Sequence, residues 1–286
     1  MKKIATIISL ILITFNINSA TKTKLKNITF NEEKNKYFCE YKDVKRSYII
    51  CLPEKYDNQT SLIIMLHGLG MSTESFMEIT QMEKYANPRN YAVVYVDAVL
   101  NPKNRTYGTG WHYFDDKFSV NDVDFIVELG KYCQAEFGLS SRVFAGGFSN
   151  GAFMVNKLLA TKADYFTGGV SVAGTMQKNI WNEKSGNPVG YLQINGTKDD
   201  VVPMDFLGSA QYSPNPSMEK VIEYYVSVNN VPKEYELIQI SDVAKMYNFS
   251  SKVGWIIIQD GRHNWPNIEF SKFEAGDVIL DFFDKL

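Results

Sequence analysis

The chain has 286 residues, of which 45% are hydrophobic and 22% charged, with a formal net charge of −2 and three cysteines. This balance excludes the basic surface that nucleic acid requires, and three cysteines without a C-x-x-C pair exclude a cysteine-rich metal site. We therefore expect no nucleic-acid partner, no metal and no cofactor.

The first twenty residues have the three parts of a secretory signal peptide. Lys2 and Lys3 form a positive start, residues 4–15 form an apolar run, and Ala20 ends a stretch suited to cleavage. The apolar run is shorter than the ~20 residues of a membrane span. We expect cleavage after Ala20, no integral membrane span, and a secreted or periplasmic protein. The alternative is an uncleaved N-terminal anchor.

Residues 21–286 suit a single domain, because no Pro-, Gly- or Ser-rich linker divides them. Near its start, two strand-like segments, Lys36–Tyr41 and Arg46–Leu52, flank a turn at Lys42–Lys45 and predict a hairpin. This hairpin would bring Cys39 and Cys51 roughly opposite one another, and a disulfide between them stays open. Cys133, on the apolar face of a predicted helix, is interpreted as a buried free thiol.

Beyond the hairpin, buried-strand patterns alternate with segments of helical period, which favours an α/β fold with a central, mostly parallel sheet flanked by helices. The predicted strands are Ser61–Leu66, Tyr91–Val96, Arg142–Phe148, Gly168–Val172, Gly190–Ile194 and Val253–Gln259. The predicted helices are Asn121–Phe137, Ser217–Asn229, Phe273–Leu286 and one beginning after Ser149. Chemistry in such sheets gathers past the carboxyl ends of the strands.

The segment Gly147-Phe148-Ser149-Asn150-Gly151 reads G-x-S-x-G between a predicted strand and a predicted helix. That context is typical of a nucleophile elbow, in which a tight, strained turn exposes the serine. Glycines on both sides are expected because side chains there would clash. Ser149 is therefore the candidate nucleophile, although the five-residue pattern also occurs in structural turns.

A serine nucleophile needs a histidine base, and the chain has only His67, His112 and His263. His263 is the one downstream of Ser149, and the fold orders its triad as Ser, Asp or Glu, His. Asp199 follows a predicted strand between them, and spacing alone does not separate it from Asp200. We expect activity to fall as His263 becomes protonated.

The negative oxygen formed by attack on an ester needs N–H donors, and two backbone groups are candidates for this oxyanion hole. One is the N–H of Asn150, directly after the nucleophile. The other is the N–H of Leu69, in the loop after the first buried strand. His67 is interpreted as structural beneath this loop, and His112 as a surface or pocket-wall residue.

Several motifs together resemble the secreted esterase family of polyhydroxybutyrate depolymerases, feruloyl esterases and acetyl xylan esterases. They occur in the order Leu66-His67-Gly68, Phe76, Trp111, Asn121-Asp122-Val123-Asp124-Phe125, Gly147-Phe148-Ser149-Asn150-Gly151, Gly196-Thr197-Lys198-Asp199, Val202-Pro203 and His263-Asn264-Trp265-Pro266. The resemblance covers roughly residues 48–284. It implies an α/β-hydrolase fold, hydrolysis of carboxylic esters and, by matching position, a triad of Ser149, Asp199 and His263.

The sequence departs from that family at two places: Asn121-Asp122 stands where two acidic residues are frequent, and Ala152 where a glycine is frequent. Neither change touches the expected chemistry. Trp111 and Trp265 are candidate substrate-binding residues if they line the cleft, and core aromatics otherwise. Asp122 is interpreted as an acid at a helix N-terminus, where the helix dipole favours it.

The sequence thus predicts a serine carboxylesterase that acts on a small or oligomeric ester through an acyl-enzyme. The alternatives are an acyltransferase or peptidase with the same triad, and a secreted binding protein without activity, because a fold does not fix a function. The natural ester, hydrolysis versus transfer, and the oligomeric state stay open.

Overall fold

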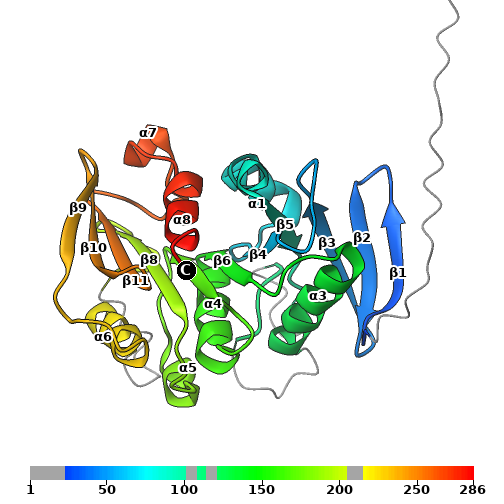
Figure 1. The fold of residues 1–286 in the computed structure, drawn as a ribbon, viewed down its shortest axis with the longest axis horizontal. Coiled ribbons are helices and arrows are strands. Elements are labelled where there is room, and N and C mark those ends of the chain that lie inside the picture. Colours follow the sequence, from blue (N-terminus) through cyan, green and yellow to red (C-terminus); the bar gives the residue numbers. More distant parts are fainter. Residues whose placement is uncertain (1–22, 101–107, 114–120, 205–214) are drawn as a thin grey trace, which may run out of the picture.

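The computed structural model describes residues 23–100, 108–113, 121–204 and 215–286, so the expected signal peptide lies outside the described residues. Within these ranges, eleven strands form one sheet in the order β1-β2-β3-β5-β4-β6-β7-β8-β11-β10-β9 (Figure 1). Their bounds are β1 Lys26–Asn31, β2 Lys36–Tyr41, β3 Val44–Cys51, β4 Ser61–Leu66, β5 Tyr91–Val96, β6 Val143–Phe148, β7 Gly168–Val172, β8 Gly190–Gly196, β9 Glu236–Ser241, β10 Ala244–Ser250 and β11 Val253–Ile258.

The middle of the sheet is parallel, and antiparallel strands lie at both ends. β5, β4, β6, β7, β8 and β11 pair in parallel, so their carboxyl ends meet at one edge. These strands are apolar throughout because both of their faces are covered. In β4, Leu62 and Ile64 enter the core on one face, while Ile63 and Met65 enter the core on the other.

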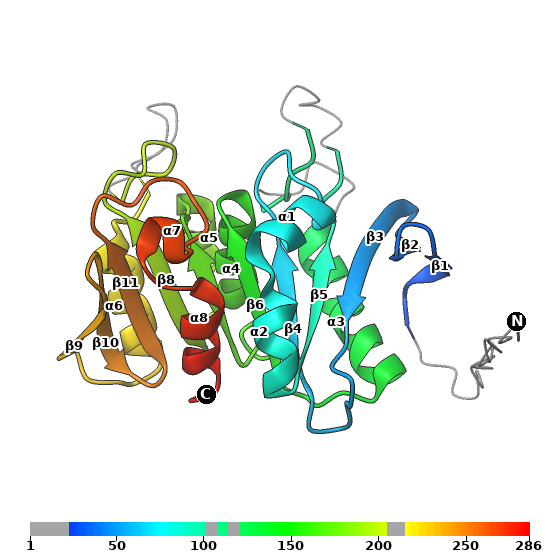
Figure 2. The same cartoon turned by 90° about the horizontal axis from the view of Figure 1, so that it is seen from above.

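Helices form a layer on each face of the sheet, above and below the strands in Figure 1, while Figure 2 looks onto the sheet with α1, α2 and α8 in front. α1, α2 and α8 cover one face, and α3 to α6 cover the other. The helices are α1 Thr73–Thr80, α2 Met82–Ala86, α3 Asp122–Phe137, α4 Asn150–Thr161, α5 Lys178–Glu183, α6 Met218–Val228, α7 Ile268–Ser271 and α8 Ala275–Phe283, with a 3₁₀ turn at Asn87–Arg89. The three-layer α/β architecture predicted from the sequence is therefore confirmed.

Helix ends follow local chemistry where the sequence predicted it. The Asn121 side chain accepts the Asp124 N–H at the start of α3, and Gly138 ends that helix with a positive φ of 62°. At the start of α6 the Ser217 hydroxyl accepts the Lys220 N–H. The predicted bounds of both helices are correct within about one residue.

The N-terminal hairpin is tighter than expected, and this overturns the interpretation that Cys39 and Cys51 lie opposite one another. Lys42 and Asp43 alone form the turn, both with positive φ, so Cys39 pairs with Arg46. Cys39 packs in the core beneath α3, while Cys51 packs on the opposite face of the sheet. Both are free thiols, and burial raises their pKa values to about 11 and about 12. Cys133 is buried and free, as expected.

Candidate active site

The turn between β6 and α4 holds Ser149 in a strained conformation. Its backbone has φ 52° and ψ −115°, a combination that residues other than glycine rarely adopt. A Cβ on Gly147 would overlap the Gly151 carbonyl, and a Cβ on Gly151 would overlap the Leu66 carbonyl. The prediction that both flanking glycines are sterically required is confirmed, and the turn presents Ser149 at the carboxyl edge of the sheet.

Three side chains from three strand ends meet at this edge. The Nε2 atom of His263 lies 2.9 Å from the Ser149 hydroxyl oxygen, and its Nδ1 lies 2.8 Å from an oxygen of Asp199. Since a carboxylate only accepts, Nδ1 carries the proton and Nε2 accepts from the hydroxyl. Such a chain can move a proton from the serine to the imidazole while the carboxylate stabilises the resulting charge.

The acid of this group is Asp199 rather than Asp200. Asp199 is 4% exposed, and the oxygen that does not face His263 accepts the N–H groups of Val201 and Val202 at 2.9 and 2.8 Å. These bonds fix the orientation of the carboxylate. Asp200 is exposed to solvent. Burial and hydrogen bonding thus separate the two neighbours that spacing alone left equivalent.

The loops that carry the acid and the histidine are joined to one another. They follow the paired strands β8 and β11, and the Lys198 N–H donates to the Gly261 carbonyl at 2.9 Å. The His263 ring packs against Phe148, with ring centroids 4.9 Å apart. We did not predict this contact, and the only signal for it was an aromatic residue directly before the candidate nucleophile.

The loop with the first candidate N–H donor is held from below by His67, which is fully buried. Its Nδ1–H donates to the Gly68 carbonyl at 2.7 Å, and its Nε2 accepts the Ala98 N–H at 3.0 Å. These partners require the neutral tautomer, and burial lowers the pKa of His67. Because a trans peptide directs C=O and N–H oppositely, fixing the Gly68 carbonyl also fixes the direction of the Leu69 N–H.

The second candidate donor, the N–H of Asn150, is at the first position of α4. The first bond within this helix runs from the Phe153 N–H to the Ser149 carbonyl, so the Asn150 N–H has no acceptor inside the helix. Among the described residues, no backbone hydrogen bond outside regular helices and strands uses the N–H of Leu69 or Asn150. Both N–H groups therefore stay candidates for the oxyanion hole.

The two tryptophans do not present open faces as the substrate-binding interpretation required. Trp111 is 3% exposed and its indole N–H donates to the His67 carbonyl at 2.9 Å. Trp265 is 5% exposed and packs edge-on against Phe76 with a centroid distance of 5.7 Å. Their large apolar area packs beside the loops of the site, which favours the core interpretation of the two that the sequence left open.

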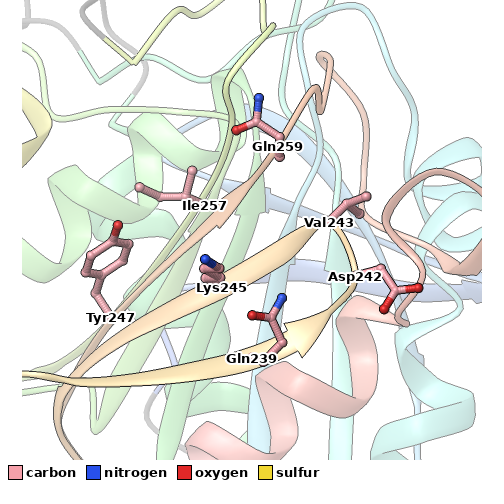
Figure 3. A pocket seen from close by; sticks show the side chains of 7 residues that line it. All are labelled: Gln239, Asp242, Val243, Lys245, Tyr247, Ile257 and Gln259. Carbon is pink, nitrogen blue, oxygen red and sulfur yellow. The ribbon is translucent and has the colours of Figure 1, made fainter.

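A hollow of about 350 Å³ lies elsewhere on the molecule, over β9, β10 and β11 (Figure 3). It is lined by Gln239, Asp242, Val243, Lys245, Tyr247, Ile257 and Gln259. Strands β7, β8 and β11 separate β6 from β10 in the sheet, and no residue predicted for the site lines this hollow. It is therefore separate from the Ser149 site.

The described part of the chain contains neither a membrane-spanning helix nor a metal-binding cluster. No helix in these ranges is long and apolar enough to cross a membrane. No group of three or more His, Cys, Asp or Glu side chains in the same part of the chain is arranged to hold a metal ion.

Sequence comparisons agree with the geometry. Residues 49–249 match the family model described as phospholipase/carboxylesterase. Feruloyl esterase B of Thermothelomyces thermophilus is 29% identical over 134 residues, covering 44% of this chain and 43% of that protein. Feruloyl esterase B of Neurospora crassa is 25% identical over 146 residues, covering 48% and 47%. The chain thus matches less than half the length of these curated relatives.

Solved structures share the fold. The acetyl xylan esterase of Aspergillus awamori superposes with a TM-score of 0.66 at 13% identity, covering 84% of this chain and 94% of that one. Esterase PE8 superposes with a TM-score of 0.52 at 16% identity, covering 84% and 100%. At such low identity these likenesses show a common fold.

Proposed function

We propose that this chain, which belongs to the phospholipase/carboxylesterase family of α/β hydrolases, is a serine esterase that cleaves carboxylic esters through an acyl-enzyme. The observation that carries the proposal is the continuous chain of hydrogen bonds from Ser149 through His263 to Asp199. The esterase names of the sequence relatives support the same reaction class.

In the first half of the reaction, the Ser149 oxygen attacks the ester carbonyl carbon as its proton passes to Nε2 of His263. The new C–O bond produces a tetrahedral oxyanion. When this intermediate collapses, the bond to the alcohol breaks, and His263 gives its proton to the departing alkoxide. An acyl group is left on Ser149.

In the second half, water takes the place of the alcohol. His263 accepts a proton from the water as its oxygen attacks the acyl carbon, and then returns the proton to Ser149 as the carboxylic acid leaves. Asp199 stays ionised, holds the imidazole in the required tautomer and stabilises its charged form. The backbone N–H groups of Leu69 and Asn150 stabilise the oxyanion in both halves, each by about 3 kcal/mol.

The substrate class follows from the relatives and from the expected signal peptide. We propose an ester outside the cytoplasm: a feruloyl ester, an acetylated sugar or a hydroxyalkanoate oligomer. The test measures hydrolysis of p-nitrophenyl acetate, methyl ferulate, acetylated xylan and a hydroxybutyrate oligomer by the purified protein. A preference of at least tenfold in kcat/KM identifies the class, and absence of hydrolysis with all four contradicts the proposal.

The same assay separates hydrolysis from acyl transfer. An ester donor is supplied with and without an added alcohol, and the products are quantified. Free acid as the main product in both cases supports a hydrolase. A new ester as the main product assigns the same three residues to an acyltransferase.

A further inference from the structure

A short segment, residues 108–113, connects the two halves of the proposed oxyanion hole; we call it the bridging segment. It hydrogen-bonds the Gly68–Met71 loop, which carries the Leu69 donor. It also hydrogen-bonds the side chain of Asn150, whose own N–H is the second donor.

Three hydrogen bonds join the bridging segment to His67 and to the Gly68–Met71 loop that follows it. The Gly70 N–H donates to the Thr109 carbonyl at 2.8 Å, and the Thr109 hydroxyl donates to the Met71 carbonyl at 2.8 Å. The Trp111 indole donates to the carbonyl of His67 at 2.9 Å. These bonds tie the loop and the segment into one hydrogen-bonded unit.

The side chain of Asn150 joins this unit to the nucleophile turn. The Trp111 backbone N–H donates to the Asn150 side-chain oxygen at 2.7 Å. Asn150 also hydrogen-bonds the Tyr113 hydroxyl; burial raises the pKa of this phenol, and the bonds from Asn150 and Gln177 partly offset the rise. The Asn150 amide thus meets the bridging segment at Trp111 and at Tyr113.

The bridging segment also packs closely against Leu69 and Asn150. A Cβ on Gly110 would lie 2.7 Å from a Leu69 side-chain carbon and 3.4 Å from the Asn150 oxygen. The next N–H along the segment, that of His112, donates at 2.8 Å to Asp122. Asp122 is fully buried in an ion pair with Arg46, at 2.6 Å. The segment is held against a rigid part of the core.

We propose that the Asn150 side chain is a positioning residue that sets the separation of the two oxyanion donors. It holds the bridging segment, and with it the Leu69 N–H, in register with its own backbone N–H. This inference rests on the proposed esterase function. It gives one residue two tasks: its main chain donates to the oxyanion, and its side chain places the other donor.

The test compares Asn150→Ala with Asn156→Ala. Asn156 lies in the same helix α4 and bonds the Ala152 carbonyl and Ser171, outside the proposed site. Asn150→Ala keeps its backbone N–H, so we expect kcat and kcat/KM to fall together, about 10- to 100-fold, because the lost interaction acts in the transition state. Asn156→Ala is expected to keep the wild-type kcat.

A second readout separates positioning from a purely structural role. A trifluoromethyl ketone adds to Ser149 and leaves an oxyanion in the proposed hole. We expect its affinity for Asn150→Ala to fall by the same factor as kcat/KM. A folded Asn150→Ala variant with wild-type kcat/KM and wild-type inhibitor affinity overturns the inference.

If Asn150→Ala does not fold, Trp111→Phe tests the contact between the bridging segment and His67. It keeps an aromatic ring in the core but removes the indole donor to the His67 carbonyl and part of the buried ring. We expect about a tenfold loss in kcat, and an unchanged kcat overturns the inference. Failure of the proposed function looks different, since wild-type protein would then hydrolyse no ester and bind no trifluoromethyl ketone.

Discussion

Two histidines at the same edge of the sheet have opposite environments. His67 follows β4, is fully buried, and bonds only backbone groups, the Gly68 carbonyl and the Ala98 N–H. His263 follows β11, has a side chain 16% exposed, and bonds two side chains, Ser149 and Asp199. Backbone partners cannot exchange protons at neutral pH, so His67 is fixed in one state, while the partners of His263 allow proton transfer.

The contrast shows why a histidine count does not identify a base. Both rings lie in loops past strand ends, and both make two hydrogen bonds. What separates them is the chemistry of the partners: a hydroxyl and a carboxylate permit a proton to move, whereas two main-chain groups fix a tautomer and a direction. We propose that His67 positions the Gly68–Leu69 peptide and that His263 takes part in the reaction.

The largest effect on kcat is expected from the substitution of His263. His263→Ala removes the only group that contacts both Ser149 and Asp199, so we expect kcat to fall by about 10⁴- to 10⁶-fold. Folding is expected to survive, because the ring is partly exposed. Ester hydrolysis and a thermal melt check both. A variant that folds and keeps more than a tenth of the wild-type kcat contradicts the assignment of His263 as base.

A conservative substitution of the acid sharpens the comparison, because it exchanges a hydrogen-bond acceptor for a donor beside His263. Asp199→Asn keeps the shape but donates where the carboxylate accepts, which favours the wrong tautomer of His263; we expect kcat to fall by about 10⁴-fold. Asp200→Asn is the matched control and is expected to stay within about twofold of wild type, because Asp200 is exposed. Equal losses in the two variants would refute the choice of Asp199.

At the other histidine, His67→Phe keeps a buried ring and removes both ring nitrogens. The Ala98 N–H then loses its acceptor, which costs about 1–3 kcal/mol of unfolding free energy. The Gly68–Leu69 peptide also loses one constraint, so we expect kcat to fall by about 10- to 100-fold. Urea denaturation and steady-state kinetics measure the two effects. Wild-type kcat in the folded variant would show that His67 does not orient the donor.

The smallest expected effect is on the pH dependence of stability. Burial lowers the pKa of His67 in the folded protein. The unfolded chain therefore takes up a proton at this ring below about pH 6.5, before the folded protein does, and acidification destabilises the fold. The contribution is at most about 1.4 kcal/mol per pH unit. We expect a shallower decline between pH 7 and 5 in His67→Phe than in wild type, and identical slopes would contradict this account.

Much of the parallel sheet is predictable from the sequence, because an apolar strand buried on both faces has a strong local pattern. Ser61–Leu66 and Tyr91–Val96 have the predicted bounds. The hairpin of Glu236–Ser241 and Ala244–Ser250 was not predicted, because at the edge of the sheet its strands are half exposed and polar.

The sequence predicts those residues of the candidate site that the chain order of the fold determines. The fold's order of nucleophile, acid and histidine selects Ser149 and His263 and narrows the acid to two neighbours. Contacts between distant segments have no local sequence pattern. No motif indicates that Asn150 accepts the Trp111 N–H, or that Trp111 and Trp265 are buried. These depend on how loops from different strands pack together.

The most direct test of the account is the site and rate of covalent labelling by a serine-directed organophosphate. We expect one adduct per chain, on the peptide that contains Ser149, with no adduct in Ser149→Ala and labelling slowed by at least 10³-fold in His263→Ala. Labelling that is absent from folded wild-type protein, or that proceeds at the wild-type rate without His263, would contradict the proposal that His263 activates Ser149.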